Sequence, residues 1–325
     1  MTLSEFLESG ISETPFAAVI GHPVSHSLSP VIHNAALREH DIPAVYYAID
    51  CPESQWPRLG ELLSHEQCKG INVTLPLKRV VMDYLDDCDE SAEAIGAVNT
   101  VVPDMGMAAK HQNSPKKPLS AHGDPGTEKT DLKKKSADKR TLRGYNTDAY
   151  GFIKPLETYP VIDTATVLGS GGASLAVQYA LASYGVNTVY LASRKHKPGR
   201  IGRGHSKEAG QGSPIIPVSY SELGDAVAES RLIVNTTPVG MHPDTNATPF
   251  PPEMGSLLKG KICYDIIYNP LETRFLALAK QNGAETIDGL GMFVFQAARA
   301  FELWFDKPMP TELARSLVLE HLKKT

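Results

Sequence analysis

Apolar residues in the first half of the chain occur in short runs, which alternate with polar loops and with segments of helical periodicity. The run at 16–21 is apolar throughout and ends at a glycine, a pattern typical of a buried strand. After a Ser- and Pro-rich loop, the pair Ser29-Pro30 predicts a helix start, with Ser29 as the cap and Pro30 in the first helical position. Such alternation predicts an α/β fold. The other elements expected here are strands at 44–49 and 70–76, a helix at 89–95 and a loop entering a strand at 96–102.

From Thr164 the alternation becomes regular, in the order strand, glycine-rich turn, helix, strand. Two more α/β units are expected around the apolar runs at 231–238 and 261–270. The chain then offers a helix at 272–283, a short segment at 284–289, an amphipathic helix at 291–305 and a terminal helix at 310–324.

Length and composition place the chain among ordinary globular proteins. Its 325 residues are enough for about two domains. Contents of 42% hydrophobic and 21% charged residues exclude collagen-like, wholly disordered and coiled-coil proteins. A net charge of −5 argues against nucleic acid as a partner. The four cysteines are scattered, and the sequence has no evident signal peptide and no apolar run of membrane-spanning length. We therefore expect a cytoplasmic protein without a membrane partner.

Two segments interrupt the α/β pattern. Residues 104–143 and 195–215 are basic, rich in Pro, Gly and Ser, and poor in large apolar side chains. Neither can bury enough surface to offset the entropy lost on ordering, so both are expected to be surface insertions. Basic runs in such a setting are more often solvated than bound to nucleic acid.

A glycine-rich turn follows the strand that begins at Thr164. Its sequence is a variant of G-x-G-x-x-G in which Ser174 replaces the third glycine, and it lies between a strand and a helix. The first glycine permits the tight turn, and the second lets the backbone approach a pyrophosphate at the helix N-terminus. A turn that binds nothing is the alternative. The residues expected to form the phosphate loop are Gly169, Ser170, Gly171, Gly172 and Ala173.

The next strand ends at Ser193, Arg194 and Lys195. A site that prefers NAD places Asp or Glu here, where the carboxylate accepts a hydrogen bond from the ribose 2′-hydroxyl. Arg194 can instead pair with a 2′-phosphate and stack on adenine. This position therefore favours NADP, although an ordinary solvated arginine would look the same.

Polar side chains of catalytic type gather at three other places. Ser27 and Ser29 lie two apart in a loop, and Asn72, Thr74 and Lys78 lie at the end of a predicted strand. The G-A-V-N-T segment with Asn99 and the G-Y-N-T-D segment with Asp148 flank the first insertion. Taken singly, each has a structural explanation: Ser29 or Asp148 as a helix cap, Thr74 as a strand residue, Asn99 as a turn residue.

Taken together, these segments resemble a known family. GHPVSHSLSPVIHN, GINVTLPLK, GAVNT, GYNTDAYGF, VLGSGGAS, NTTPVGM, YDIIYNPLET and DGLGMFVFQAA occur in this order. The set closely resembles the shikimate dehydrogenases and the broader quinate/shikimate dehydrogenase family, over nearly the whole chain outside the two insertions. The resemblance implies a nicotinamide enzyme that reduces 3-dehydroshikimate to shikimate, a step of aromatic amino-acid and chorismate biosynthesis.

The resemblance also implies residue roles. It matches Ser27 and Ser29 to the substrate carboxylate, Tyr268 to a further substrate contact, Thr74, Asn99 and Gln296 to the ring hydroxyls, and Lys78 and Asp148 to the catalytic pair. The chemistry suits that pair, because hydride delivered to a ketone carbon creates negative charge on oxygen. An ammonium stabilises this charge and donates a proton, and a lysine is protonated at neutral pH.

In the nucleotide half, the resemblance extends to the nicotinamide side. Thr236, Ile266, Gly289 and Met292 match positions there, and Glu90 matches a peripheral cofactor contact more weakly. The family's N-R-T at the strand end is S-R-K here, so Ser193 and Lys195 depart from the pattern and Arg194 keeps it.

The expected architecture is an N-terminal α/β substrate domain followed by a Rossmann-type, doubly wound NADP-binding domain. The expected bounds are 1–147 and 148–289, with the helices of 290–325 returning to the first domain. The active site is expected in the cleft between the domains. Both a monomer and a homodimer are consistent with the sequence.

Three alternatives to this function remain open. They are a quinate/shikimate dehydrogenase, an aminoshikimate dehydrogenase, and a non-catalytic metabolite sensor of the same fold. The Ser-x-Ser pair favours shikimate over quinate, and an intact Lys/Asp pair argues against the sensor. No metal site is expected, because Pro23 prevents His22 and His26 from lying on one helix and no third ligand is evident.

Overall fold

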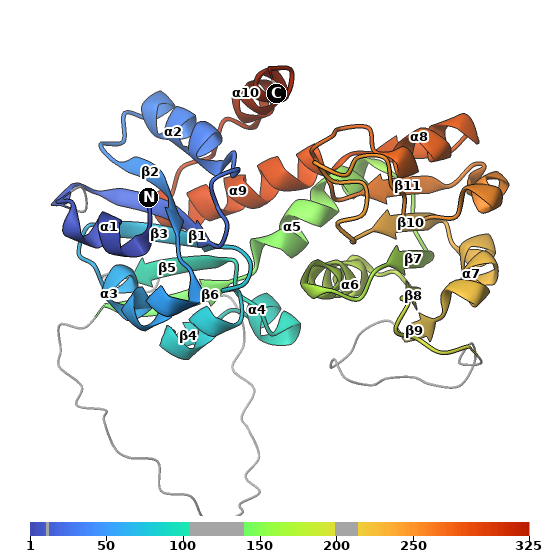
Figure 1. The fold of residues 1–325 in the computed structure, drawn as a ribbon, viewed down its shortest axis with the longest axis horizontal. Helices are drawn as coiled ribbons and strands as arrows, with labels where there is room; N and C mark the ends of the chain where they lie inside the picture. The colour runs from blue at the N-terminus through green and yellow to red at the C-terminus, as the bar shows by residue number, and fades with distance from the viewer. Residues whose placement is uncertain (11–12, 105–139, 199–213, 325) are drawn as a thin grey trace, which may run out of the picture.

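The computed structural model describes residues 1–10, 13–104, 140–198 and 214–324, and it contains two six-stranded sheets joined by helices (Figure 1). The first sheet has the order β2-β1-β3-β5-β6-β4 and mixes parallel and antiparallel pairs. Its strands are β1 (Phe16–Gly21), β2 (Val45–Asp50), β3 (Cys68–Val73), β4 (Asp87–Cys88), β5 (Thr100–Asp104) and β6 (Thr141–Tyr145).

The second sheet is wholly parallel and has the order β12-β11-β10-β7-β8-β9. In chain order this is the 3-2-1-4-5-6 arrangement of a doubly wound nucleotide-binding sheet. Its strands are β7 (Thr164–Leu168), β8 (Thr188–Ala192), β9 (Ile215–Val218), β10 (Leu232–Asn235), β11 (Ile262–Asp265) and β12 (Glu285–Ile287). The predicted α/β class with a Rossmann-type second sheet is confirmed.

Ten α-helices and five described 3-10 helices accompany the strands. The α-helices are α1 (Leu3–Glu8), α2 (Ser29–Glu39), α3 (Leu59–Leu63), α4 (Glu90–Ile95), α5 (Thr147–Ile153), α6 (Gly172–Tyr184), α7 (Leu223–Glu229), α8 (Arg274–Gln281), α9 (Gly289–Phe305) and α10 (Thr311–Leu322). The 3-10 helices are η2 (Glu53–Arg58), η3 (Val80–Tyr84), η4 (Lys154–Thr158), η5 (Tyr220–Glu222) and η6 (Pro252–Leu258). No helix within the described ranges is long and apolar enough to cross a membrane.

Strand β1 is apolar throughout because both of its faces are covered. Phe16, Ala18 and Ile20 belong to a buried cluster with side chains of α1 and α3. Ala17 and Val19 belong to another, with side chains of α2, α9 and α10. Successive side chains of a strand point to opposite faces, so a strand buried on both faces has no polar alternation.

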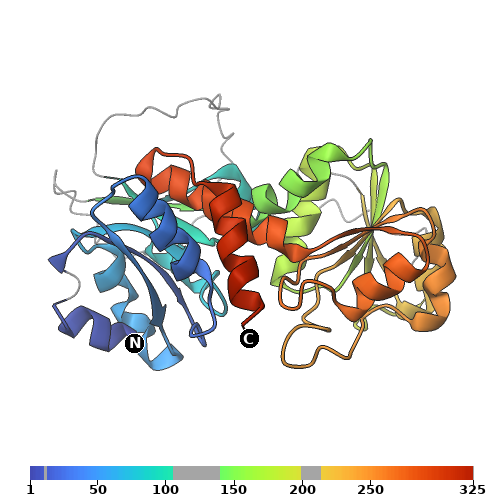
Figure 2. The same cartoon turned by 90° about the horizontal axis from the view of Figure 1, so that it is seen from above.

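Two helices connect the halves of the molecule (Figures 1 and 2). Helix α5 follows β6 of the first sheet and packs against α6 and α9, and α9 also contacts β3 and β5. Gly151 permits the close packing of α5 on α9, because a Cβ atom there would lie 2.6 Å from the Met292 carbonyl oxygen. Helix α10 then packs on α2. The end of the chain thus returns to the N-terminal half, while the domain boundaries at 147/148 and 289/290 stay a prediction.

Three sequence-based expectations need correction. Ser29 is not the cap of α2: Leu28 is the N-cap, Ser29 is the first helical residue, and no side chain caps this end. The predicted insertion at 104–143 is too wide, because Asp104 and Thr141 are paired in the β5–β6 ladder. The one at 195–215 likewise includes Ile215, the first residue of β9. Most of both insertions, 105–139 and 199–213, lies outside the described residues.

Candidate active site

Lys78 and Asp148 meet at the centre of the candidate site. Lys78 follows β3 by five residues, and its carbonyl accepts a 2.8 Å hydrogen bond from the Val98 backbone. Asp148 lies in the first turn of α5, whose N-cap is Asn146, so it is not itself the cap. Lys78 Nζ donates to Asp148 Oδ2 at 2.6 Å, and the two side chains remain 24% and 15% exposed. The pair is therefore held by the protein and still reachable by a ligand.

The second carboxylate oxygen of Asp148 is held by Asn99. Asn99 Nδ2 donates to Asp148 Oδ1 at 2.8 Å, and Asn99 Oδ1 accepts from the Thr147 backbone at 2.8 Å. Asn99 is 3% exposed, so its amide has little freedom to turn. This fixes the Asp148 carboxylate from the side opposite to Lys78.

A buried chain of hydrogen bonds continues from Asn99 towards the serine loop. Thr100 Oγ1 donates to Asn99 Oδ1 at 3.0 Å, and Asn72 Nδ2 donates to Thr100 Oγ1 at 3.1 Å. Tyr46 Oη donates to Asn72 Oδ1 at 2.7 Å. Burial raises the pKa of Tyr46, so its hydroxyl stays protonated. The polar groups from Lys78 to Tyr46 are thus linked without a break, and Ser29 lies beside Tyr46.

The serine loop and Thr74 lie together at the end of β1. Ser27 Oγ accepts from the Ser29 backbone at 3.3 Å. Thr74 donates its backbone N–H to the Ile20 carbonyl at 2.8 Å, and its methyl group lies 2.3 Å from where a Cβ on Gly21 would be. Ser29 is buried and Ser27 is half-buried. Glycine at position 21 is what lets the Thr74 side chain approach the loop.

Tyr268 and Gln296 belong to the C-terminal half of the chain, and both contact Phe293 of α9. The Tyr268 ring stacks on the Phe293 ring at a centroid distance of 4.6 Å, and Gln296 Nε2 donates to the Phe293 carbonyl at 3.0 Å. Tyr268 packs on the same apolar cluster as Val24 of the serine loop, and burial raises the pKa of its hydroxyl. No described contact joins Tyr268 or Gln296 directly to Lys78.

The glycine-rich turn has the geometry of an anion-binding loop. Gly169 adopts φ 103°, and a Cβ there would lie 2.7 Å from Thr237 Cγ2. Gly171 is the N-cap of α6, and no side chain caps this helix. Cβ atoms on Gly171 and Gly172 would meet nothing within 4 Å. The Ser174 N–H donates to the Gly171 carbonyl at 3.1 Å, and the preceding backbone N–H groups of α6 lie beside this open space.

Ser193 connects this turn to the end of β8. Ser193 is buried, and its Oγ lies 2.9 Å from Ser170 Oγ and accepts from the Lys195 backbone at 3.3 Å. Arg194 and Lys195 are exposed beside it. A cationic strand end thus lies next to the phosphate loop.

The residues predicted on the nicotinamide side are brought together around β10 and β11. Thr236 Oγ1 donates to the Leu168 carbonyl at 2.8 Å and adjoins Gly169. A Cβ on Gly289 would lie 2.2 Å from the Ile266 carbonyl oxygen, and Met292 faces Gly151 one turn along α9. Glu90 lies apart from this group, exposed on α4 near Tyr179 of α6.

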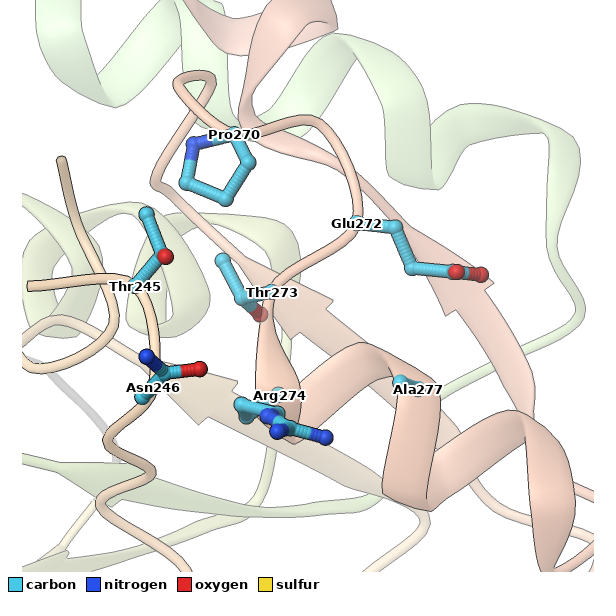
Figure 3. A pocket seen from close by; sticks show the side chains of 7 residues that line it. All are labelled: Thr245, Asn246, Pro270, Glu272, Thr273, Arg274 and Ala277. Atoms are coloured by element: carbon cyan, nitrogen blue, oxygen red, sulfur yellow. The ribbon is translucent and has the colours of Figure 1, made fainter.

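Two hollows of similar size lie elsewhere. Figure 3 shows one of about 330 Å³ at the start of α8, and no predicted site residue lines it. The other, of about 320 Å³, is bounded by α4, α5, α6 and α9 and includes Thr147 but not Asp148. Within the described ranges, no three His, Cys, Asp or Glu side chains gather as a metal ion would require.

Comparisons with known proteins agree with this geometry. The family described as "Shikimate dehydrogenase substrate binding domain" matches residues 19–101, and "Shikimate 5'-dehydrogenase C-terminal domain" matches residues 289–319. Shikimate dehydrogenase (NADP(+)) of Moorella thermoacetica is 37% identical over 95% of this chain and 94% of its own length. This chain belongs to the shikimate dehydrogenase family. The homologue of Methanopyrus kandleri is 34% identical over 96% of this chain and 97% of its own.

A solved shikimate dehydrogenase has the same architecture. The structure from Thermus thermophilus, in complex with NADP(H) and shikimate, covers 94% of this chain and 99% of its own, with a TM-score of 0.71 and 31% identity. The predicted membership of the shikimate dehydrogenase family is confirmed. The individual residue roles stay predictions.

Sequence reasoning missed several residues of this shikimate dehydrogenase site. Tyr46, Thr100 and Thr147 were not singled out, and Asn72 was noticed only for its place at a strand end. Thr100 follows the predicted residue Asn99, and Thr147 follows Asn146, which lies in the G-Y-N-T-D motif but was not itself predicted. The repeated N-T pair on both sides of the first insertion was the available signal.

Proposed function

We propose that this protein is an NADP-dependent shikimate dehydrogenase, which catalyses the reversible reduction of 3-dehydroshikimate to shikimate in chorismate and aromatic amino-acid biosynthesis. The observation that carries the proposal is the 2.6 Å contact between Lys78 Nζ and Asp148 Oδ2, with Asn99 on the other carboxylate oxygen. A ketone reductase needs a proton donor held beside the carbonyl oxygen, and this arrangement provides one.

Lys78 and Asp148 divide the proton transfer between them. When bound, NADPH supplies the hydride that reduces the ketone carbon. The Lys78 ammonium stabilises the negative charge that develops on the ketone oxygen and donates the proton that completes the hydroxyl group. Asp148 orients Lys78 through their hydrogen bond, and it accepts a hydrogen bond from a ring hydroxyl. In the oxidising direction, neutral Lys78 takes the proton back.

The remaining polar groups orient the substrate ring. Ser27 and Ser29 donate their hydroxyls to the substrate carboxylate at one end. Thr74, Asn99 and Gln296 hold the ring hydroxyls, and Tyr268 supplies a further contact. The buried chain through Tyr46 and Asn72 supports this assignment, because it links the Lys78–Asp148 pair to Tyr46, whose backbone is hydrogen-bonded to Asn34 of the helix that begins at Ser29.

The second sheet fits NADP as the cofactor. The uncapped N-terminus of α6 and the open space at Gly171 and Gly172 suit a pyrophosphate. Arg194 would pair with the 2′-phosphate, next to Ser193 and Lys195. Thr236, Ile266, Gly289 and Met292 would line the nicotinamide side, with Glu90 at the periphery. The loop glycines, Ser170 and Ala173 would hold the phosphates through backbone N–H groups.

The same proposal gives the domain roles. Residues 1–147 form the substrate domain, 148–289 the NADP-binding domain, and 290–325 return to the first, so that the ligands meet in the cleft between them. Closure over the ligands would exclude water from the hydride transfer. The protein would act in the cytoplasm on a small-molecule substrate, as a monomer or homodimer.

Steady-state assays at the absorbance band of the reduced nicotinamide test the function. Purified protein is given shikimate with NADP⁺, and in parallel quinate with NAD⁺, shikimate with NAD⁺, and quinate with NADP⁺. The proposal expects the highest kcat/KM with shikimate and NADP⁺. A preference for quinate or NAD⁺ would replace it with the quinate/shikimate alternative. Binding of shikimate without turnover would indicate a sensor.

A further inference from the structure

Asp265 is a fully buried carboxylate at the C-terminal end of β11, with 0% exposure. Three donors converge on it. Asn235 Nδ2 and the Ile267 backbone N–H donate to Oδ1 at 3.0 and 3.1 Å, and Thr273 Oγ1 donates to Oδ2 at 2.7 Å. A carboxylate is the one side chain whose two oxygens accept all three bonds without presenting a donor of its own.

The donors on Oδ1 lead to two separate loops of the site. Asn235 connects Asp265 to the loop after β10. Its Oδ1 accepts hydrogen bonds from the Thr237 backbone at 2.9 Å and from Thr237 Oγ1 at 2.7 Å. Ile267 lies between Ile266 and Tyr268. The hydrogen bond from its N–H to Asp265 therefore holds the segment 266–268 in place. The donor on Oδ2 leads away from the site, since Thr273 is the N-cap of α8.

Folding alone gives little reason for a charge at this position. Burial raises the pKa of Asp265 to about 6, so the carboxylate is ionised at neutral pH inside the protein. Hydrogen bonds from Thr273, Ile267 and Asn235 act against this desolvation, and no cation among the residues that the structure describes contributes. A buried charge without a counter-ion is costly, and such groups are retained more readily for placement than for stability.

We propose that Asp265 is a positioning residue, which holds the Thr236–Thr237 loop and the Ile266–Tyr268 segment at a fixed separation across the nicotinamide and substrate side. The inference rests on the proposed function. Asp265 itself touches neither ligand. Its effect passes through Asn235 and Ile267 to groups that do, and loss of the tie lets the two loops move relative to each other.

The variant Asp265→Ala tests whether Asp265 holds the two loops at a fixed separation, and Thr273→Val is the matched control. The control also removes a buried hydrogen bond to Asp265, but it leaves both bonds on Oδ1. We expect Asp265→Ala to lower kcat by about 10²-fold and to raise the KM for shikimate, because small misplacements of reacting groups are costly. The KM for NADP⁺ should rise as well, because Thr236 and Thr237 adjoin Gly169 of the phosphate loop. Thr273→Val should lower the Tm while leaving kcat and both KM values near those of the wild type.

Asp265→Asn provides the rescue. Asparagine keeps an acceptor oxygen for Asn235 and Ile267, and its amide can donate to Thr273, so most of the kcat should return. If Asp265→Ala is recovered unfolded, Asn235→Ala cuts the same tie from the β10 side and should give the same kinetic pattern. Equal kinetics in Asp265→Ala and Thr273→Val, or an Asp265→Asn as impaired as the alanine variant, would overturn the proposal.

Hydrogen–deuterium exchange separates this inference from the proposed function. Without any substrate, Asp265→Ala should exchange faster than wild type in peptides covering 236–240 and 266–269, and at the wild-type rate in those covering 16–30. Thr273→Val should show no such change in these peptides. A wild type without shikimate turnover contradicts the proposed function, whereas unchanged exchange at both loops contradicts the positioning role of Asp265.

Discussion

Lys78 and Asp148 lie 70 residues apart in the sequence, yet their side chains form a hydrogen bond of 2.6 Å. One partner follows a strand of the first sheet, and the other opens the helix that leaves this sheet for the second. Asp148 lies in the first turn of α5, directly after Thr147 and the N-cap Asn146. The contact therefore joins the proposed proton-transfer pair to the helix that links the two halves.

Replacing Lys78 by Ala should remove the proton donor and leave the fold intact. We expect kcat to fall by about 10²–10⁴-fold, the usual range for loss of a general acid–base group, with smaller changes in KM. Steady-state rates and the Tm of the purified variant measure both. Lys280→Ala is the matched control, because Lys280 of α8 forms an exposed ion pair with Glu272, which precedes this helix. A Lys78→Ala enzyme with near-normal kcat would refute the assignment.

Replacing Arg194 by Ala should weaken the binding of NADP⁺ and leave the binding of NAD⁺ unchanged. Charged hydrogen bonds contribute about 1.5–3 kcal/mol, so the KM for NADP⁺ should rise by about 10–100-fold. The same variant assayed with NAD⁺ is the internal control, because NAD⁺ lacks the 2′-phosphate. An equal effect on both cofactors would show that Arg194 does not contact that phosphate.

Much of the fold could be predicted from local pattern. The run at 16–21 coincides with β1, and the glycine-rich turn lies between β7 and α6 as expected. Periodicity carries this information because buried faces repeat along an element. Strand β6 was not predicted. Its residues 141–145 adjoin a lysine-rich segment, and the composition of that segment led to an insertion being predicted as far as residue 143.

The site was predictable only in part. Single residues such as Ser29 or Asp148 had equally good structural explanations, and the family resemblance selected among them. Contacts such as Tyr46 to Asn72 join β2 and β3, which are separated by β1 in the sheet, so no local spacing predicts them. Asp265 was hidden for another reason: nothing in the letters YDIIYNP indicates that its carboxylate is fully buried.

Replacing Gly151 by Ala should displace α9 at the substrate site. The new Cβ would lie 2.6 Å from the Met292 carbonyl oxygen and 2.8 Å from the Gln296 backbone nitrogen, and backbone atoms cannot move aside cheaply. Overpacking of this kind costs about 1–3 kcal/mol of stability, and moving Gln296 should raise the KM for shikimate. Thermal unfolding and shikimate titrations measure the two effects.

Gly224→Ala is the control for that substitution. Gly224 lies in α7, where a Cβ would meet only Leu257 Cδ1 at an ordinary 3.8 Å. Alanine there should stabilise the helix by about 0.5–1 kcal/mol and leave the kinetics unchanged. A Gly151→Ala variant that behaves like this control would mean that α9 tolerates the extra methyl group.

His33 should make the stability of the protein depend on pH. The ring is fully buried on α2 and stacks on Tyr46 at 4.2 Å, and neither ring nitrogen has a hydrogen-bond partner among the described residues. Burial lowers the pKa of His33 to about 3, whereas a histidine in the unfolded chain titrates near 6.5. Between these values the unfolded state binds a proton that the folded state does not. Stability is therefore full above pH 6.5 and falls as the pH drops.

Replacing His33 by Phe removes this titration and keeps a ring against Tyr46. The wild type should lose about 2 kcal/mol of unfolding free energy relative to His33→Phe between pH 6.5 and 4.5, since the limiting slope is about 1.4 kcal/mol per pH unit. Urea unfolding of both proteins at several pH values gives the difference. Any packing strain from the larger ring shifts that difference by a constant and leaves its slope untouched. Parallel pH profiles for the two proteins would show that His33 is protonated equally in the folded and unfolded states, and hence that water reaches it.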